Sequence, residues 1–337
     1  MITRVEVTPG NVRMIAVAGV AQLAEGVARV AVSACGLCGT DLHLYEGMTM
    51  PPGASYPVYP GHEVAGIVVE LGPGTGDALP LGTPVVLHPL AECGVCDLCR
   101  AGLGDECARG EVLGLHRPGG LASEVVWPVS RMVAVPGLDP LHAAVLADAV
   151  ATAKRALDKA RLPSGGALCV FGAGGVGTHV LGLARLADPT ARLIGVVRSP
   201  ASADRLRGAG YDAVVSGTDL RPFGPFDAVI DFSGDPAAPA LAMRNLRPGG
   251  TLVFGSVIEA DLDLGAGQRV QVRELVVAGV YSSSMQDLRA VAELAVSGAL
   301  DLSASVTHRF GLNDAAEAFQ TLAARPPGML RVAVTTQ

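Results

Sequence analysis

A-L-C-V-F-G-A-G-G-V-G-T-H-V, residues 167–180, predicts a strand, a tight turn and the start of a helix. Glycines spaced as Gly172-x-Gly174-x-x-Gly177 permit the turn, the close approach of a pyrophosphate, and contact between helix and strand. N–H groups at the helix start face the anion. Because a strand precedes the motif and a helix follows it, we interpret it as a dinucleotide-binding turn. Its candidate cofactor-binding residues are Gly172, Gly174, Gly175, Val176 and Gly177. The apolar stripe expected on the helix is Val176, Val180, Leu183 and Ala187.

Beyond this turn, short apolar runs alternate with helical or loop segments, as buried parallel strands require. Six such runs predict a doubly wound parallel sheet. Their ranges are 168–171, 193–197, 213–215, 228–230, 251–254 and 275–280. The last part of the chain predicts helices at 286–297 and 313–324 and a final strand at 331–335.

The first part of the chain, to about residue 136, has a different rhythm. Short alternating runs such as 27–32 and 62–71 are divided by Gly, Pro and Asp, which predicts an all-β domain. The proline-rich segment 51–60 is expected to be a surface loop. At 337 residues the chain is long for one hydrophobic core, so two domains are expected.

The amino-acid composition excludes some classes of binding partner. The formal net charge is −7 and no basic block is present, which argues against nucleic acid as a partner. No apolar run reaches membrane-spanning length, and the first ten residues lack the apolar segment of a signal peptide. We therefore expect a cytoplasmic protein that acts on a small molecule and binds neither nucleic acid nor membrane.

Four of the seven cysteines lie within fifteen residues, at Cys93, Cys96, Cys99 and Cys107. Four thiolates in one loop can close a tetrahedral zinc shell with no open position, which is typical of a structural site. The alternatives are four free, reactive thiols or an iron–sulfur cluster, and the usual spacing of cluster ligands is different. The sequence favours a structural zinc.

A second set of metal-ligand residues lies upstream, in Cys38-Gly39-Thr40-Asp41-Leu42-His43 and in Gly61-His62-Glu63. A catalytic zinc takes three protein ligands and keeps a fourth position open. Together with the four-cysteine lobe and the glycine turn, in this order, the chain resembles a zinc-dependent medium-chain alcohol dehydrogenase over nearly its whole length.

The resemblance implies an α/β plus β fold, with a GroES-like β-barrel catalytic domain and a Rossmann doubly wound parallel sheet domain. We expect residues 1–149 to form the GroES-like domain with both zinc sites. Residues 150–281 would form the dinucleotide-binding domain, and residues 282–337 would return to the first domain. The family also implies a homodimer or homotetramer.

The resemblance maps the first two catalytic zinc ligands onto Cys38 and His62, and the third onto Asp148. The third ligand is usually Cys or Glu, but a carboxylate oxygen of Asp binds zinc at about the distance of an imidazole nitrogen. Two alternatives stay open, because Asp148 could instead cap the helix that follows and Glu63 is a rival carboxylate. Asp41 resembles the carboxylate that holds the ligand histidine in its metal-binding tautomer.

Catalysis by such a site needs a route for the proton. The resemblance implies that zinc polarises the alcohol or carbonyl oxygen while hydride moves to or from the nicotinamide. Thr40 would begin a proton relay, and His43 would be its outer member, since imidazole exchanges protons near neutral pH. The simpler interpretations are a buried threonine and a surface histidine.

The residues at the end of the second expected strand of the parallel sheet, 193–197, indicate whether the cofactor is NAD(H) or NADP(H). An NAD site usually has Asp or Glu there, about twenty residues after the glycines, but this strand is followed by Arg198 and Ser199. A guanidinium and a hydroxyl suit the 2′-phosphate of NADP(H). The sequence favours NADP(H) over NAD(H), with a solvent-facing arginine and bound NAD(H) as the alternative.

Other cofactor contacts are implied by the resemblance. Asp231 would approach the adenine-side ribose, Gly255, Ser256 and Val257 the nicotinamide-side ribose, and Arg331 the pyrophosphate. The leading prediction is a zinc-dependent, NADP(H)-linked enzyme that interconverts an alcohol and an aldehyde or ketone. The alternatives are a polyol, sugar or amino-acid-alcohol dehydrogenase, possibly NAD(H)-linked, and a non-catalytic cofactor-binding protein.

Overall fold

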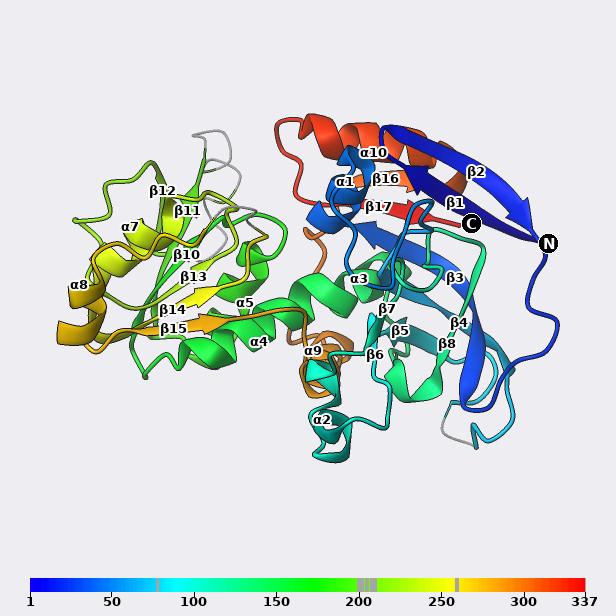
Figure 1. The fold of residues 1–337 in the computed structure, drawn as a ribbon. Helices are drawn as coiled ribbons and strands as arrows, with labels where there is room; N and C mark the ends of the chain where they lie inside the picture. The colour runs from blue at the N-terminus through cyan, green and yellow to red at the C-terminus, as the bar shows by residue number, and fades with distance from the viewer. Residues whose placement is uncertain (77–78, 199–202, 204–205, 207–210, 258–260, 337) are drawn as a thin grey trace. The chain divides into compact units, whose positions relative to one another are not determined.

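The computed structural model describes residues 1–76, 79–198, 203, 206, 211–257 and 261–336. The chain divides into two compact units, and each is described here by itself. Unit 1 consists of residues 1–148 and 284–337, and unit 2 of residues 149–283. The chain end therefore returns to the first unit, as the colours of Figure 1 show.

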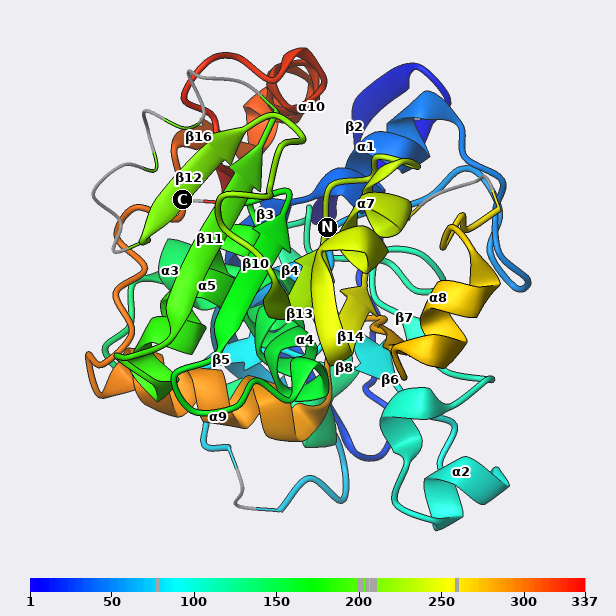
Figure 2. The ribbon, with the colours of Figure 1, turned by 90° about the vertical axis from the view of Figure 1, so that its left-hand side faces the viewer.

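Unit 2 contains a parallel sheet of six strands in the order β12-β11-β10-β13-β14-β15. Figure 2 shows this order from β12 to β14. This is the strand order of a doubly wound nucleotide-binding sheet, in which ligands bind beyond the carboxyl ends of the two central strands. Here those strands are β10 and β13, so the predicted doubly wound sheet is confirmed. The strands are β10 (Ala167–Phe171), β11 (Arg192–Val197), β12 (Ala213–Ser216), β13 (Phe226–Asp231), β14 (Leu246–Phe254) and β15 (Val276–Gly279).

Helices pack against this sheet through apolar faces. In α5 the buried residues include Val180, Leu183 and Ala184, whereas Ala187 at the end of the helix is exposed. The stripe expected from the sequence is therefore wrong at Ala187, because the helix ends there and the chain leaves the sheet. The described helices of unit 2 are α4 (Ala151–Ala160), α5 (Gly177–Ala187), α7 (Ala238–Asn245) and α8 (Gly267–Val272).

Unit 1 is built on a seven-stranded sheet that runs β16-β17-β3-β4-β5-β9, with β8 also paired to β3. The long β3 is central, because β4, β8 and β17 all pair with it antiparallel. Trp127 and Phe319 are among the largest fully buried side chains of its core. The strands are β3 (Val27–Leu37), β4 (Glu63–Leu71), β5 (Pro84–Leu87), β8 (Glu124–Pro128), β9 (Met132–Ala134), β16 (His308–Gly311) and β17 (Val332–Thr335).

Unit 1 also contains smaller strands and short helices. The sequence predicted an all-β first part, but short helices interrupt its strands. The small strands are β1 (Ile2–Thr8), β2 (Asn11–Val17), β6 (Leu90–Ala91) and β7 (Glu111–Val112). The α-helices are α1 (Gly39–Glu46), α2 (Asp97–Arg100), α3 (Pro140–Val145), α9 (Met285–Val296) and α10 (Ala315–Ala324). The 3₁₀ turns are η1 (Gly104–Glu106), η2 (Val129–Arg131) and η4 (Leu312–Asp314), and the π-helical turn η3 (Leu146–Val150) follows α3.

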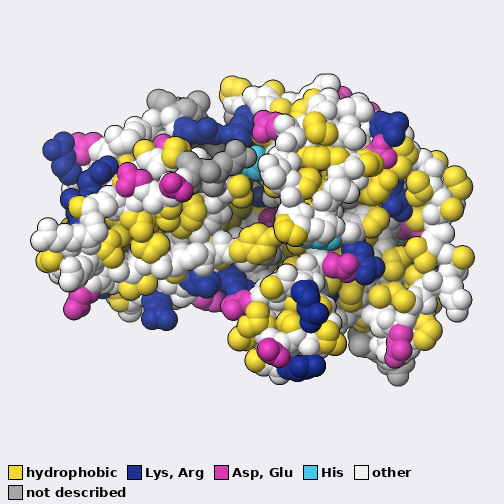
Figure 3. All heavy atoms as spheres, viewed as in Figure 1, with side chains coloured by type: hydrophobic (Ala, Val, Ile, Leu, Met, Phe, Trp, Pro, Cys, Tyr) yellow, Lys and Arg dark blue, Asp and Glu magenta, His cyan; other side chains and the backbone are white. Residues whose placement is uncertain are grey.

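Charged side chains of both signs are interspersed on the face drawn in Figure 3, and they do not gather into one basic block. This distribution lacks the clustered cationic surface that a phosphate backbone requires. Among the described helices, none combines the length and the apolar composition needed to cross a bilayer.

Candidate active site

Cys38 sits at the start of α1, where the helix begins with a capping box. Its Sγ accepts a hydrogen bond from the backbone N–H of Thr40 at 3.2 Å. Its own backbone N–H donates to Oδ2 of Asp41 at 2.9 Å. The sulfur therefore faces the positive end of the helix, which favours a thiolate. The local sequence Cys-Gly-Thr-Asp fixes this cap, because the acid stands three residues after the capping side chain.

His62 is brought to Cys38 by the register of two strands. Gly36 of β3 pairs with Glu63 of β4, so the residues just beyond these strand ends are adjacent. Nε2 of His62 lies 3.2 Å from Sγ of Cys38, and Nδ1 lies 3.9 Å from Oδ1 of Asp41. With Asp41 on the Nδ1 side, Nε2 is the nitrogen that faces the sulfur and is free to act as a ligand.

Asp148 approaches from a third element, the π-helical turn η3. Turns of this kind occur mostly as single turns within helices, frequently at functional sites. Oδ2 of Asp148 lies 3.6 Å from Nε2 of His62. In a tetrahedral zinc site, bonds of about 2.0–2.3 Å place neighbouring ligand atoms about 3.3–3.6 Å apart. The sulfur, nitrogen and oxygen therefore fit one metal ion, although they come from three elements.

Glu63 is also close, and ligand atoms of Cys38, His62, Glu63 and Asp148 all lie within 4.8 Å of one another. Its carboxylate, however, accepts a hydrogen bond from the guanidinium of Arg331. Both side chains are buried, and a Cβ at Gly36 would overlap the Glu63 carboxylate. Sequence reasoning missed this pair and the need for glycine at 36. Residue spacing gave no signal, since the partners come together only in the fold.

Arg331 thus lies in unit 1 with its guanidinium against Glu63, at 4% exposure. The pyrophosphate contact expected of it stays a prediction. Burial lowers the pKa of Arg331, but the Glu63 carboxylate and the Cys38 thiolate outweigh burial and raise it. Burial raises the pKa of Glu63 to about 7, even though Arg331 opposes the shift.

The site concentrates acidic groups away from water. Burial raises the pKa of Cys38, while His62 partly offsets that rise. Burial lowers the pKa of His62, but Cys38, Asp41 and Asp148 together raise it well above its ordinary value. Several buried acids that share one imidazole favour a cation in their midst, because a buried anion is costly unless it is paired. The donor set therefore fits a divalent metal.

The two proposed relay residues lie three positions apart on α1, on neighbouring positions of one helix face. Thr40 is half-buried, and the His43 side chain is 41% exposed with Nδ1 3.8 Å from Glu46. This places one member near Cys38 and the other toward solvent, as a relay requires. Their roles remain predictions.

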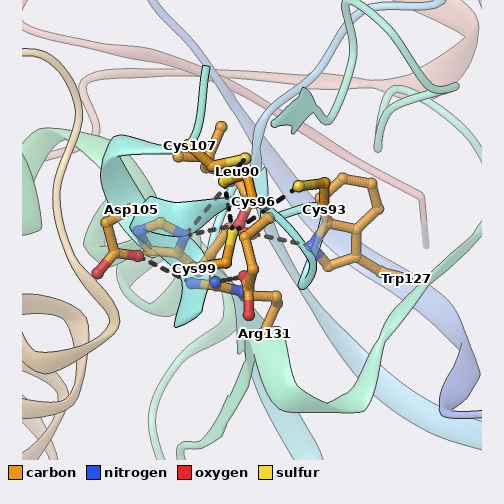
Figure 4. Close-up of polar contacts among 10 residues, drawn as sticks. Leu90, Cys93, Cys96, Cys99, Asp105, Cys107, Trp127 and Arg131 are labelled. Atoms are coloured by element: carbon orange, nitrogen blue, oxygen red, sulfur yellow. Dashed lines mark hydrogen bonds and ion pairs between the residues drawn. The ribbon is translucent and has the colours of Figure 1, made fainter. Parts of the chain in front are cut away.

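The four cysteines predicted to bind zinc gather in one cluster (Figure 4). Their sulfurs are 3.9 Å apart for Cys93 and Cys99, 3.4 Å for Cys96 and Cys99, and 3.7 Å for Cys96 and Cys107. A tetrahedral shell with Zn–S bonds of about 2.3 Å has S···S separations of about 3.8 Å. All four are unbridged thiols, so the cluster fits one tetrahedral metal ion.

In unit 2, the glycines after β10 have distinct surroundings. Gly172 has φ +72°, and a Cβ there would meet the backbone of Phe232 at 2.6 Å. At Gly177 a Cβ would lie 2.4 Å from the carbonyl oxygen of Gly172, so the helix contacts the turn closely. At Gly174 the nearest atom to a Cβ would be the carbonyl oxygen of Gly172 at 3.9 Å, so this position is less crowded than the other two and suits the approach of a phosphate. Gly175 and Val176 complete the turn, and both are half-buried.

The other predicted cofactor residues follow the carboxyl ends of the neighbouring strands. Arg198 comes directly after β11 and is exposed, and Ser199 lies outside the described residues. Gly255 and Ser256 follow β14, where Oγ of Ser256 donates to the Asp231 carbonyl oxygen at 3.2 Å. Val257 is 64% exposed.

Asp231 differs from the expectation of a ligand-facing side chain. It has no exposed area, and its Oδ1 accepts hydrogen bonds from the N–H and the hydroxyl of Ser233 at 2.8 and 2.7 Å. In the structure it therefore shapes the turn after β13. The ribose contact predicted for it would require this carboxylate to become accessible.

The chain is similar to known proteins over most of its length. Residues 24–137 match the alcohol dehydrogenase GroES-like domain, and residues 175–297 match the zinc-binding dehydrogenase family. The D-altritol 5-dehydrogenase of Agrobacterium fabrum (strain C58) is 30% identical over 308 residues, 88% of each chain. The L-galactonate-5-dehydrogenase of Escherichia coli (strain K12) is 29% identical over 305 residues, also 88% of each. A chain from Sinorhizobium meliloti 1021, solved bound to NADP, has a TM-score of 0.88 at 27% identity and 99% coverage of both chains.

Proposed function

This chain belongs to the zinc-dependent medium-chain alcohol dehydrogenase family, and we propose that it interconverts an alcohol and an aldehyde or ketone by hydride transfer with a nicotinamide dinucleotide. The observation that carries this proposal is the convergence of the Cys38 sulfur, the His62 Nε2 and the Asp148 carboxylate. Three protein ligands would leave the fourth position of a tetrahedral ion to the substrate, which a purely structural site does not need.

The residues of the site have separable tasks. Cys38, His62 and Asp148 would hold the ion, and Asp41 would keep His62 oriented with Nε2 toward it. When bound, zinc supplies a Lewis acid to the substrate oxygen and the dinucleotide accepts or donates hydride. Thr40 would take the proton from the substrate hydroxyl, and His43 would pass it to solvent. Glu63, held by Arg331, would contribute negative charge beside the ion without being its third ligand.

For the cofactor, we favour NADP(H) over NAD(H). Arg198 stands exposed at the end of β11, where an NAD site usually has an acid. A guanidinium there pairs with a 2′-phosphate, whereas a carboxylate would repel it. The related Sinorhizobium meliloti chain was solved with NADP, which supports the choice.

A polyhydroxylated substrate is a second candidate within the same chemistry. Two relatives that cover 88% of the chain are named for oxidation at carbon 5 of galactonate and of altritol. Such compounds carry a secondary hydroxyl, which would be oxidised to a ketone. This points to a polyol or sugar acid rather than a simple primary alcohol.

The four-cysteine cluster is proposed to hold a second, structural zinc. Four sulfurs at tetrahedral separations leave no open position for substrate. Its contribution would be to fold the loop, since structural zinc sites supply folding free energy.

A homodimer formed through β15 is also proposed. Among the described residues, this strand lies at the edge of the unit 2 sheet and has β14 as its one paired neighbour. Val276 and Val277 are 48% and 37% exposed on it. An exposed apolar edge strand presents unpaired backbone N–H and C=O groups, so it is prone to pair with another chain. The same strand of a second copy of this chain would pair with these groups.

A direct test compares alcohols, alditols and sugar acids as substrates with NADP⁺ and NAD⁺, with metal content measured on the same sample. Cys38→Ser should lose one metal ion and nearly all turnover. Cys35→Ser is the matched control, because Cys35 is buried on the adjacent strand but lies outside the ligand set. Full turnover in the Cys38 variant, or turnover that survives removal of all metal, would refute the proposal.

A further inference from the structure

Arg131 is a buried cation outside the catalytic site. It ends the turn η2 between β8 and β9 and is 5% exposed. Nη1 donates to Oδ1 of Asp105 at 2.8 Å, and Nη2 forms an ion pair with Oε2 of Glu92. A buried guanidinium is costly unless it is paired, and these two carboxylates supply the opposite charge at Nη1 and Nη2, while Nε has no hydrogen-bond partner among the described residues.

Both carboxylates belong to the loop of the four cysteines. Glu92 immediately precedes Cys93, and Asp105 lies two residues before Cys107. One guanidinium therefore contacts this loop twice, just before the first cysteine and again between the third and the fourth. Figure 4 shows Arg131 and Asp105 linked beside the cysteine cluster.

The backbone around Arg131 is itself fixed to the barrel. Its carbonyl oxygen accepts a hydrogen bond from the N–H of His88 at 2.8 Å. The carbonyl oxygen of His88 in turn accepts one from Nε1 of the buried Trp127, also at 2.8 Å. The guanidinium thus extends from a rigid base at the start of β9 to the cysteine loop.

The fit around the guanidinium is close. A Cβ at Gly104 would lie 3.3 Å from Nη2 of Arg131 and 3.2 Å from Cγ of Glu92. The planar fork of arginine matches two carboxylates at once, whereas a lysine ammonium is a single point of charge on a flexible stem. The geometry therefore calls for arginine in particular.

We propose that Arg131 is a positioning residue for the four-cysteine metal site, which it keeps ready for one ion by holding Glu92 and Asp105. This inference rests on the structural zinc proposed above. Ordering a loop around an ion costs conformational entropy, and a loop that is already held at two points has less to lose. Loss of Arg131 should therefore weaken metal retention by the four cysteines, while the catalytic ligands keep their ion.

A hollow beside the four-cysteine cluster indicates where the site would become accessible when Arg131 is replaced. A hollow of about 390 Å³ is lined by Arg131, Cys99 and Met285, among other residues of unit 1. Because Cys99 lines this hollow, we expect a chelator to approach the cluster from it. Removal of the guanidinium would enlarge the hollow and release Glu92 and Asp105.

The test compares Arg131→Met and Arg131→Lys with Arg29→Met. Arg29 is a matched control, because it is 9% exposed and pairs with Glu70 and Glu124 in the same unit but does not touch the cysteine loop. The measurement is the rate at which a coloured chelator removes zinc. In the cobalt(II)-loaded protein, the strong thiolate-to-metal absorption of a four-thiolate site, as opposed to the weaker absorption from the single Cys38 thiolate, reports which site is emptied.

We expect both Arg131 variants to lose the cysteine-bound ion about ten- to a hundredfold faster than wild type, as for other residues that support metal ligands. Arg29→Met should lower thermal stability without changing that rate. Glu92→Gln and Asp105→Asn each remove one arm of the grip, and they should show smaller increases even if Arg131→Met fails to fold.

Release that is equally fast in the Arg131 and Arg29 variants would overturn the inference and leave the structural zinc intact. Wild-type protein without the absorption of a four-thiolate cobalt site would overturn both the structural zinc and this inference. Retention of the band in all variants at the wild-type rate would refute the positioning role alone.

Discussion

Arg331 stands 268 positions after Glu63 in the chain, yet its guanidinium donates to Oε1 of that carboxylate inside unit 1. The pair joins the residue just before β17 to the first residue of β4. It also ties the chain end to the residue beside the candidate ligand His62. Because neither side chain is exposed, each depends on the other for its charge to be tolerated.

Removal of one partner should therefore be costly. We expect Arg331→Met to destabilise unit 1 by about 3–5 kcal/mol, because it leaves the Glu63 carboxylate buried without its cation. Urea unfolding followed by a signal from unit 1 measures the change. The double variant Glu63→Gln with Arg331→Met should recover much of the loss, and additive effects of the two single changes would contradict the pairing.

The third metal ligand can be identified by replacing each of the two candidate carboxylates in turn. Asp148→Ala should lose the catalytic ion, because Oδ2 of Asp148 lies in the ligand cluster, 3.6 Å from Nε2 of His62. Glu63→Gln should keep the ion, since its carboxylate is engaged by Arg331. Metal content after gel filtration decides between them, and loss of the ion only in the Glu63 variant would reverse the assignment.

Cofactor preference should depend on Arg198. Its replacement in Arg198→Ala should raise the KM for NADP(H) about ten- to a hundredfold, the equivalent of one charge-assisted hydrogen bond, and leave NAD(H) nearly unchanged. Arg221→Ala is a control on another exposed arginine of unit 2, which pairs with Asp219. A wild-type enzyme that prefers NAD(H) in kcat/KM would contradict the prediction.

Asp188 gives a pH-dependent prediction for unit 2. Its carboxylate accepts hydrogen bonds from Thr190 and from the N–H of Gly165, and these lower its pKa to about 2. A depressed folded-state pKa stabilises the fold above the unfolded value near 3.8, and that stabilisation is lost as the pH falls toward 2.

Asp188→Asn should therefore lower the melting temperature at pH 7, and its difference from wild type should shrink as the pH falls below 4. Asp261→Asn makes the same charge change at an exposed residue and serves as the control. A difference that stays constant between pH 7 and pH 3 would mean that the carboxylate charge is not what stabilises this turn.

Self-association should depend on β15. A lysine at Val276 would place a charge on the exposed edge strand, so Val276→Lys should convert the proposed dimer to a monomer. Light scattering should then give a mass near 34.2 kDa instead of twice that value. Val69→Lys is the control, because Val69 is similarly exposed on β4 of unit 1. A wild-type mass near 34.2 kDa would refute the dimer.

The sequence by itself determined the features that depend on local order. Two motifs depend only on residues that are close together in the chain. They are the glycines of the turn after β10 and the four cysteines Cys93, Cys96, Cys99 and Cys107. Strand and helix ranges followed from apolar periodicity for the same reason. The likeness of these motifs to one dehydrogenase family also predicted the two-part fold, which the family matches confirm.

Tertiary structure alone decided which distant side chains meet. The register of β3 against β4 sets His62 beside Cys38, and a π-helical turn brings Asp148 to them. Packing also buried Asp231, whose contact with a ribose stays a prediction. Spacing along a chain carries no information about such encounters, because strand pairing and close packing join residues that are hundreds of positions apart. The contacts of Arg131 with Asp105 and Glu92 of the cysteine loop are likewise decided by the tertiary structure.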